Sequence, residues 1–144
     1  MTNANKQLKE INVYIFGSCK SNTPDKEGYY VAEMKYKSVS KVLCRKVNNT
    51  TSNRMLLHAV IDVLTALKET CIINLYTPTH IGLGRIKNKQ GEYRLTEGTL
   101  NADLLNQVCM FILDGGFIIN EFVTQEHKYR LKSMINKTNK KGRN

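Results

Sequence analysis

Alternating apolar and polar positions in the first third of the chain predict three strands. Residues 11–16 are apolar and aromatic and run into Gly17, as expected for a buried strand that leads into a turn. Residues 28–37 alternate between a more apolar and a more polar side, which is typical of a half-buried strand. Residues 39–47 repeat a weaker alternation after a Ser-containing connection. The three strands are therefore expected to form an antiparallel meander.

In the middle of the chain, the spacing of apolar residues predicts a helix. Residues 50–53 supply several capping side chains, and apolar residues then recur at helical spacing up to Lys68. The β-prone run 71–76 comes next, so we expect a parallel βαβ connection. Residues 81–99 mix glycine with Lys and Arg, which predicts a short turn of helix followed by a basic loop.

The C-terminal part adds two helices and a strand. Asn101 can cap a second amphipathic helix, which Gly115 and Gly116 would end. Residues 117–123 predict a last strand, and residues from about 126 to 135 predict a third helix. The predicted order is βββαβ, a poorly formed crossover, and then αβα, which indicates one α/β domain.

Length and composition are consistent with a single domain. A chain of 144 residues with 41% hydrophobic content can bury one core. We expect the domain to span residues 11–135, with polar or basic flexible termini at 1–10 and 136–144. No stretch has the pattern of a signal peptide or of a membrane span, so a cytoplasmic location is expected. The four cysteines form no CxxC pair, and we expect neither zinc nor any other cofactor.

The charge of the chain points to a polyanionic partner. There are 22 Lys and Arg residues against 12 Asp and Glu residues, which gives a formal net charge of +10. Nucleic acid is the partner that such an excess favours, although a general bias toward Lys also accounts for part of it. No acidic residue follows Glu126, so the chain ends in a basic tail whose role stays open.

Five short stretches, in the correct order and elements, resemble the ribonuclease H family. They are residues 17–19 after the first strand, 28–29 at the start of the second, 50–55 at the first helix, 76–77 at the end of the fourth strand and 101–104 at the later helix. The resemblance implies the ribonuclease H fold, a mixed five-stranded sheet in βββαβαβα order that is flanked by helices.

The same resemblance locates the positions where that family holds catalytic metal. Its clustered carboxylates bind two divalent ions, which activate a water molecule for phosphoryl displacement. The positions that match three of these carboxylates hold Phe16, Leu56 and Pro78, and residues 128–144 contain no Asp or Glu that could be the fourth. Such side chains cannot coordinate magnesium. They predict a degenerate member without bound metal, in which one apolar plug fills the former site.

The residues that the family uses to hold nucleic acid match better. Contacts to the backbone and 2′-hydroxyl groups are implied for Gly17, Ser18, Cys19, Ser52, Asn53 and Arg54. Helix capping is an alternative reason for Ser52 and Asn53. Salt-dependent phosphate contacts are expected from a basic loop with Arg85, Lys87, Lys89 and Arg94. No Trp is present and the Tyr residues lie mostly in strands, so no base-stacking platform is predicted.

The sequence therefore predicts a catalytically inactive ribonuclease H-like protein that binds an RNA/DNA hybrid or duplex without cleaving it. One alternative is a scaffold whose apolar former site docks a protein partner. Another is a metal-dependent ribonuclease with relocated ligands, for which the candidates are Glu33, Asp62, Glu121 and Glu126. His127 is expected to be a solvated loop histidine, and a nucleophile built from Cys19 and His127 would lack an orienting third group.

Overall fold

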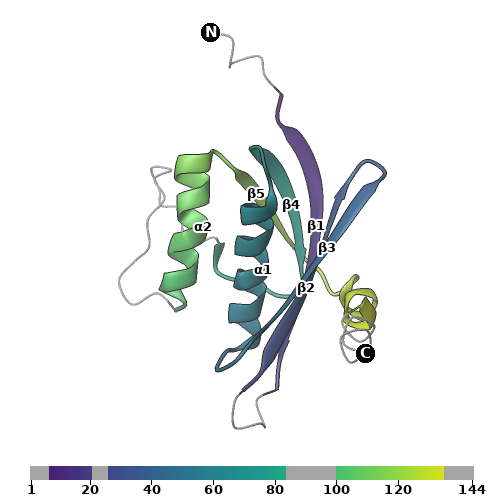
Figure 1. The fold of residues 1–144 in the computed structure, drawn as a ribbon, viewed down its shortest axis with the longest axis vertical. Coiled ribbons are helices and arrows are strands. Elements are labelled where there is room, and N and C mark those ends of the chain that lie inside the picture. The colour runs from purple at the N-terminus through teal and green to yellow at the C-terminus, as the bar shows by residue number, and fades with distance from the viewer. Residues whose placement is uncertain (1–6, 21–25, 84–99, 135–144) are drawn as a thin grey trace.

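A five-stranded mixed sheet is the centre of the molecule. The computed structural model covers the whole chain and describes residues 7–20, 26–83 and 100–134. The strand order is β3-β2-β1-β4-β5. An antiparallel meander is formed by β1 (Lys9–Cys19), β2 (Gly28–Tyr36) and β3 (Val39–Val47), and β4 (Cys71–Thr77) and β5 (Ile118–Val123) continue the sheet in parallel with β1 (Figure 1).

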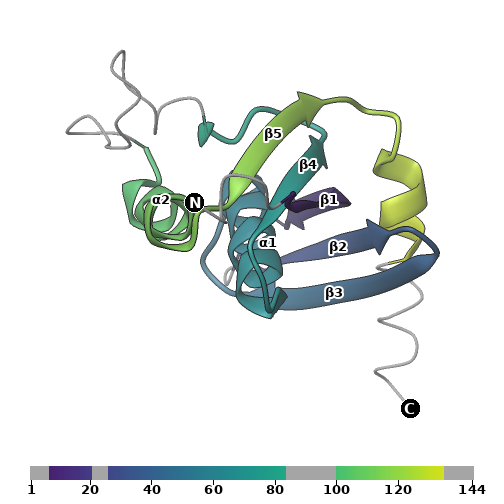
Figure 2. The same ribbon diagram turned by 90° about the horizontal axis from the view of Figure 1, so that it is seen from above.

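Helices lie on both faces of this sheet. On one face pack α1 (Ser52–Ala66) and α2 (Ala102–Gly115), and on the other lies a short helix over residues 128–134, here called the C-terminal helix (Figure 2). The main core lies between the sheet and the two long helices. A smaller cluster of buried residues, Phe16, Val31 and Leu131, lies beneath the C-terminal helix. The predicted α/β class and the mixed five-stranded sheet are confirmed.

Local chemistry explains where the long helices begin and end. Thr51 caps α1, because its Oγ1 accepts a hydrogen bond of 3.2 Å from the backbone N–H of Arg54. Gly116 ends α2 with φ 72°, a left-handed conformation that glycine adopts without strain. Asn101 precedes α2, but its side chain makes no capping hydrogen bond. The predicted capping role of Asn101 is therefore wrong, and its carboxamide bonds to Arg54 instead.

The observed elements follow the predicted order, with differences at their ends. β1 runs on to Cys19, which pairs with Gly28 of β2, so the residues predicted to form a turn after the first strand lie in the strand itself. The predicted crossover lies mostly in residues 84–99, outside the described residues, as do residues 1–6 and 135–144. The predicted domain limits and flexible termini thus stay predictions. None of the described helices is long and apolar enough to cross a membrane.

Candidate nucleic-acid interface

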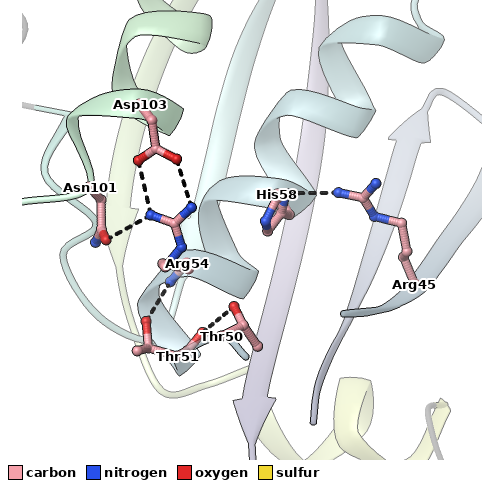
Figure 3. Close-up of polar contacts among 7 residues, drawn as sticks. All are labelled: Arg45, Thr50, Thr51, Arg54, His58, Asn101 and Asp103. Carbon is pink, nitrogen blue, oxygen red and sulfur yellow. Dashed lines mark hydrogen bonds and ion pairs between the residues drawn. The ribbon is translucent and has the colours of Figure 1, made fainter. Parts of the chain in front are cut away.

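The starts of α1 and α2 meet around one arginine. Arg54, in the first turn of α1, donates from Nη1 to Asp103 Oδ1 at 2.9 Å and from Nη2 to Asp103 Oδ2 at 2.7 Å. Its Nη1 also donates to Asn101 Oδ1 at 3.3 Å (Figure 3). We call Thr51, Arg54, Asn101 and Asp103 the helix-start cluster. Its two-pronged ion pair holds the planar guanidinium in a fixed orientation.

Two helix N-termini and the ion pair of Arg54 with Asp103 set the charge of the helix-start cluster. Each helix N-terminus carries a partial positive charge, and here two of them converge beside a guanidinium. The hydrogen bonds from Arg54 lower the pKa of Asp103 to about 2, so the carboxylate stays charged and keeps Arg54 in place at neutral pH. The Arg54 side chain remains 29% exposed. Three of the five guanidinium N–H donors are used by Asp103 and Asn101, so a phosphate oxygen can accept only from the remaining ones.

The end of β1 packs closely on the start of α1, which brings together most of the predicted contact residues. A Cβ atom at Gly17 would lie 3.2 Å from the carbonyl oxygen of Ser52, so this position admits little more than glycine. Cys19 lies nearby and its thiol donates to the carbonyl of Thr50 at 3.2 Å. Ser52 and Asn53 are exposed in the first turn of α1. These residues lie at the end of β1 and in the first turn of α1, and their role in holding nucleic acid stays a prediction.

The remaining predicted contact residues are Ser18 and the residues of the basic loop. Ser18 alternates with Gly17 and Cys19 along β1, so its side chain faces the other side of the sheet. The alternation of side chains along a strand would have predicted this direction of Ser18 if the predicted strand had extended to Cys19. The basic loop residues Arg85, Lys87 and Lys89 lie outside the described residues, and their role stays a prediction.

A second polar network joins β3 to α1. Arg45 Nη2 lies 2.7 Å from His58 Nδ1 (Figure 3). Arg45 Nε lies 3.2 Å from Asp62 Oδ2, which also accepts a hydrogen bond from the Tyr30 hydroxyl. Because arginine only donates, His58 Nδ1 is the acceptor and its ring proton is on Nε2. Burial, and then the charge of Arg45, lower the pKa of His58, which keeps this side chain neutral at pH 7.

The positions expected to form one apolar plug are divided between two clusters. Leu56 is 1% exposed and belongs to the main core. Phe16 lies in the smaller cluster with Val31 and Leu131, beneath the C-terminal helix. Pro78 is half-buried just after β4, and its carbonyl accepts a hydrogen bond from Gln125 at 2.7 Å. The prediction of a single plug is therefore wrong, because Phe16 and Leu56 pack in different layers.

The described residues do not fit the metal pair that the family implies. The side chains of Phe16, Leu56 and Pro78 carry no oxygen, nitrogen or sulfur that could bind a divalent ion. Over residues 7–20, 26–83 and 100–134, no group of three or more His, Cys, Asp or Glu residues is placed to hold one. Glu33 instead pairs with Arg130, and Glu121 accepts a hydrogen bond of 3.2 Å from the backbone of Ile81.

His127 lies against aromatic rings on the same face as the C-terminal helix. Its ring makes edge contacts with Tyr14 and Tyr76, at centroid distances of 4.5 and 5.5 Å. It is half-buried, so the expectation of a solvated loop histidine is wrong. Its partners come from β1 and β4, which are far apart in sequence, and only the paired register of these strands could have revealed the contact.

Comparisons with known proteins agree with this fold. A family model described as RNase H matches residues 8–124. Ribonuclease H of Desulforamulus reducens is 44% identical over 86 residues, which cover 60% of this chain and 53% of that protein. The chain spans about half the length of the curated relatives it matches.

Solved structures show the same architecture at low sequence identity. LC9-RNase H1, a type 1 RNase H with the type 2 active-site motif, superposes with a TM-score of 0.66 at 16% identity, over 83% of this chain and 64% of that chain. LC11-RNase H1 in complex with an RNA/DNA hybrid gives a TM-score of 0.57 at 12% identity, over 84% and 92% of the two chains. At such identities the likeness shows the fold alone.

These comparisons contradict the prediction of a pseudo-enzyme that binds nucleic acid without cleaving it. The curated relatives are named ribonuclease H or ribonuclease HI, which is the name of an enzyme. Phe16, Leu56 and Pro78 show only that these three side chains hold no metal, and they do not show a loss of activity. Since the family model matches most of the chain and the fold is that of solved ribonucleases H, the chain belongs to the ribonuclease H family.

Proposed function

We propose that the chain acts on nucleic acid as a ribonuclease H, with an RNA/DNA hybrid as its substrate, and that the helix-start cluster holds a backbone phosphate of that substrate. The observation that carries the proposal is the convergence of two helix N-termini on the fixed guanidinium of Arg54. The net charge of +10 adds a general attraction to a polyanion. The solved complex of LC11-RNase H1 with an RNA/DNA hybrid supports the choice of substrate.

Contacts of this kind would be made to the backbone and not to base edges. Arg54 would donate to a phosphate oxygen while Asp103 keeps its orientation. Gly17, Ser52 and Asn53 lie beside this point and are proposed to contact neighbouring sugar and phosphate groups. Binding through such contacts is independent of base sequence and weakens as salt displaces the bound chain.

Hydrolysis is the part of the proposal that rests on the names of the relatives. The described side chains at the three family carboxylate positions do not fit a metal pair, so binding and cleavage have to be measured separately. Contact with a protein partner and a cytoplasmic location stay predictions.

The test is a titration of the purified chain with fluorescent RNA/DNA hybrid, double-stranded DNA and double-stranded RNA. Each duplex is measured at two salt concentrations, with magnesium or manganese present, and the products are resolved on a denaturing gel. Salt-sensitive binding that prefers the hybrid, together with cut RNA strands, is the expected result. Absence of binding at low salt overturns the proposed substrate, and intact strands under every condition overturn the proposed hydrolysis.

A matched pair of variants tests whether the hybrid binds at the helix-start cluster. Arg54→Gln should weaken hybrid binding and reduce by about one the slope of log affinity against log salt, as expected for the loss of one phosphate contact. Lys9→Gln removes the same charge from the opposite end of the sheet, where Lys9 pairs with Glu69 beyond the end of α1. This control should bind like the wild type. Equal losses in the two variants would mean that only net charge matters.

A further inference from the structure

Three aromatic rings stack in a row across β1, β4 and β5, on the face of the sheet opposite α1 and α2. The centroids of Tyr14 and Tyr76 are 4.9 Å apart with an interplanar angle of 16°, and those of Tyr76 and Phe122 are 5.2 Å apart with an angle of 22°. Strand register produces the row, because Tyr14 pairs with Tyr76 and Tyr76 pairs with Phe122. These spacings are close to the distance of about 4.8 Å between neighbouring strands, so the rings face one another along the row. We call them the aromatic column.

One end of the aromatic column is closed by cations. The guanidinium of Arg130 lies 5.3 Å from the ring centroid of Tyr14, and the Nζ atom of Lys35 lies 5.9 Å from it. His127 adds edge contacts to the first two rings. This end is thus held by the C-terminal helix and by β2, and it offers no flat surface to a ligand.

The other end of the column is open at the edge of the sheet. Phe122 belongs to β5, an edge strand of the described sheet, and is 45% exposed. No ring of another described residue stacks on its outer face. An exposed ring whose inner face is already stacked is held rigidly, and a further ring can continue the stack at little cost in conformational entropy.

A row of asparagines runs beside the column and ends at the same edge. Asn74 Nδ2 donates to Asn12 Oδ1 at 3.2 Å, and Asn120 Nδ2 donates to Asn74 Oδ1 at 3.2 Å. Among the described residues no donor reaches Asn120 Oδ1. Asn120 and Phe122 are two residues apart on one strand face, about 7 Å along β5, so a ring stacked on Phe122 would have a hydrogen-bond acceptor near its edge.

The open end and the helix-start cluster lie on opposite faces of the sheet, and both lie toward the carboxyl ends of β1, β4 and β5. β1, β4 and β5 are parallel, so their carboxyl ends lie at the same end of the sheet, where parallel sheets commonly bind ligands. Phe122 is the penultimate residue of β5, and α1 begins beside the carboxyl end of β1. A nucleic acid held at the helix-start cluster can therefore reach Phe122 by extending a single strand of nucleotides around this end of the sheet.

We propose that Phe122 stacks an unpaired nucleobase of the bound nucleic acid, with Asn120 accepting a hydrogen bond from an amino or imino group of that base. The inference rests on the proposed function, and it adds a single-stranded extension to the substrate. A second copy of the chain could also cover β5, but a net charge of +10 on each copy opposes self-association and attracts a polyanion.

Because the chain contains no tryptophan, Phe122→Trp provides a unique fluorescent reporter at the open end. This variant is titrated with a blunt RNA/DNA hybrid, with the same hybrid carrying a single-stranded DNA extension, and with an extension made of abasic sites. Stacked bases should quench the indole only with the base-containing extension. The abasic extension carries the same phosphates, so it separates stacking from charge.

Affinities of two alanine variants complete the test. Phe122→Ala should lose the gain in affinity that the extension gives, about tenfold for one stacked base, while binding of the blunt hybrid is unchanged. Ile118→Ala is the control, because Ile118 is an apolar residue on the same face of β5 and is 47% exposed. It should keep the gain.

The outcomes separate this inference from the proposed function. Blunt hybrid that binds without any gain from the extension overturns the nucleobase site and leaves the proposed substrate standing. No binding of any duplex overturns both. A tryptophan signal that changes with protein concentration alone, together with a doubled mass in sedimentation, identifies a second copy as the occupant of β5 and overturns the nucleobase site.

Discussion

Removal of the Leu131 side chain should test how the C-terminal helix is held to the sheet. The described part of this helix covers residues 128–134, about two turns, so its position depends on what it packs against. Leu131 is 1% exposed and contributes to the cluster with Phe16 and Val31. Leu131→Ala removes three buried carbon atoms, and at about 0.8 kcal/mol for each the lost transfer free energy is about 2.4 kcal/mol.

The cavity term should be small at this site, because a short terminal helix can move to close the space. We therefore expect the free energy of unfolding to fall by about 2–3 kcal/mol, toward the low end of the range for leucine-to-alanine changes in cores. Urea unfolding followed by circular dichroism gives the value. Lys132→Ala, an exposed change in the same helix, is the control and should stay within about 0.5 kcal/mol of the wild type. A loss below about 0.5 kcal/mol for Leu131→Ala would refute the packing of this helix on Phe16 and Val31.

Four further predictions concern the packing around α1 and the polar network beside it. Leu56→Glu should cost at least about 3 kcal/mol of stability, because it puts an unpaired charge into the core, and an unchanged melting midpoint would show that the position is open to water. Gly28→Ala should cost about 1–3 kcal/mol in urea unfolding, since the added Cβ atom would lie 2.4 Å from Thr50 Cγ2, and a neutral result would mean that Thr50 moves freely. Below pH 6.5 the unfolded chain takes up a proton at His58 before the folded chain does, so stability should fall as the pH drops from about 6.5 toward the lowered folded-state pKa and should level off below it. Arg45→Ala should raise the pKa of His58 in an NMR titration, and an unchanged pKa would assign the shift to burial alone.

Element order was predictable because each element carries its own local pattern. The capping side chain of Thr51 and the helical spacing after it mark α1, and the left-handed conformation at Gly116 marks the end of α2. The ends of β1 were not predictable in the same way. Gly17 interrupts the apolar run and suggests a turn, yet pairing with β2 continues to Cys19, because backbone hydrogen bonds do not depend on the side chain.

Single stretches of sequence predicted where the candidate site lies, but not which of its residues contact one another. Residues 50–55, which include Arg54, indicate a site near the start of α1. The partner Asp103 is 49 residues away from Arg54, so no local sequence pattern predicts the fixed orientation of the guanidinium. Asn101 shows the same difficulty, since a residue type that favours capping serves instead as an acceptor for Arg54. Tertiary contacts decide between two roles that one side chain can equally perform.

The same reason explains both the wrong prediction of one plug and the missed aromatic column. Phe16 and Leu56 were grouped because the family groups the carboxylates at these positions, but an apolar side chain goes to whichever layer can bury it. Leu56 joins the core beneath α1, whereas Phe16 is covered by Leu131 from the other side. In the aromatic column, residues that no pattern had grouped lie together: Tyr76 and Phe122 are 46 positions apart and are brought together only by strand register. Each apolar side chain in this fold therefore goes to the layer that can cover it, and apolar surface stays exposed where a layer is incompletely covered, as at Phe122.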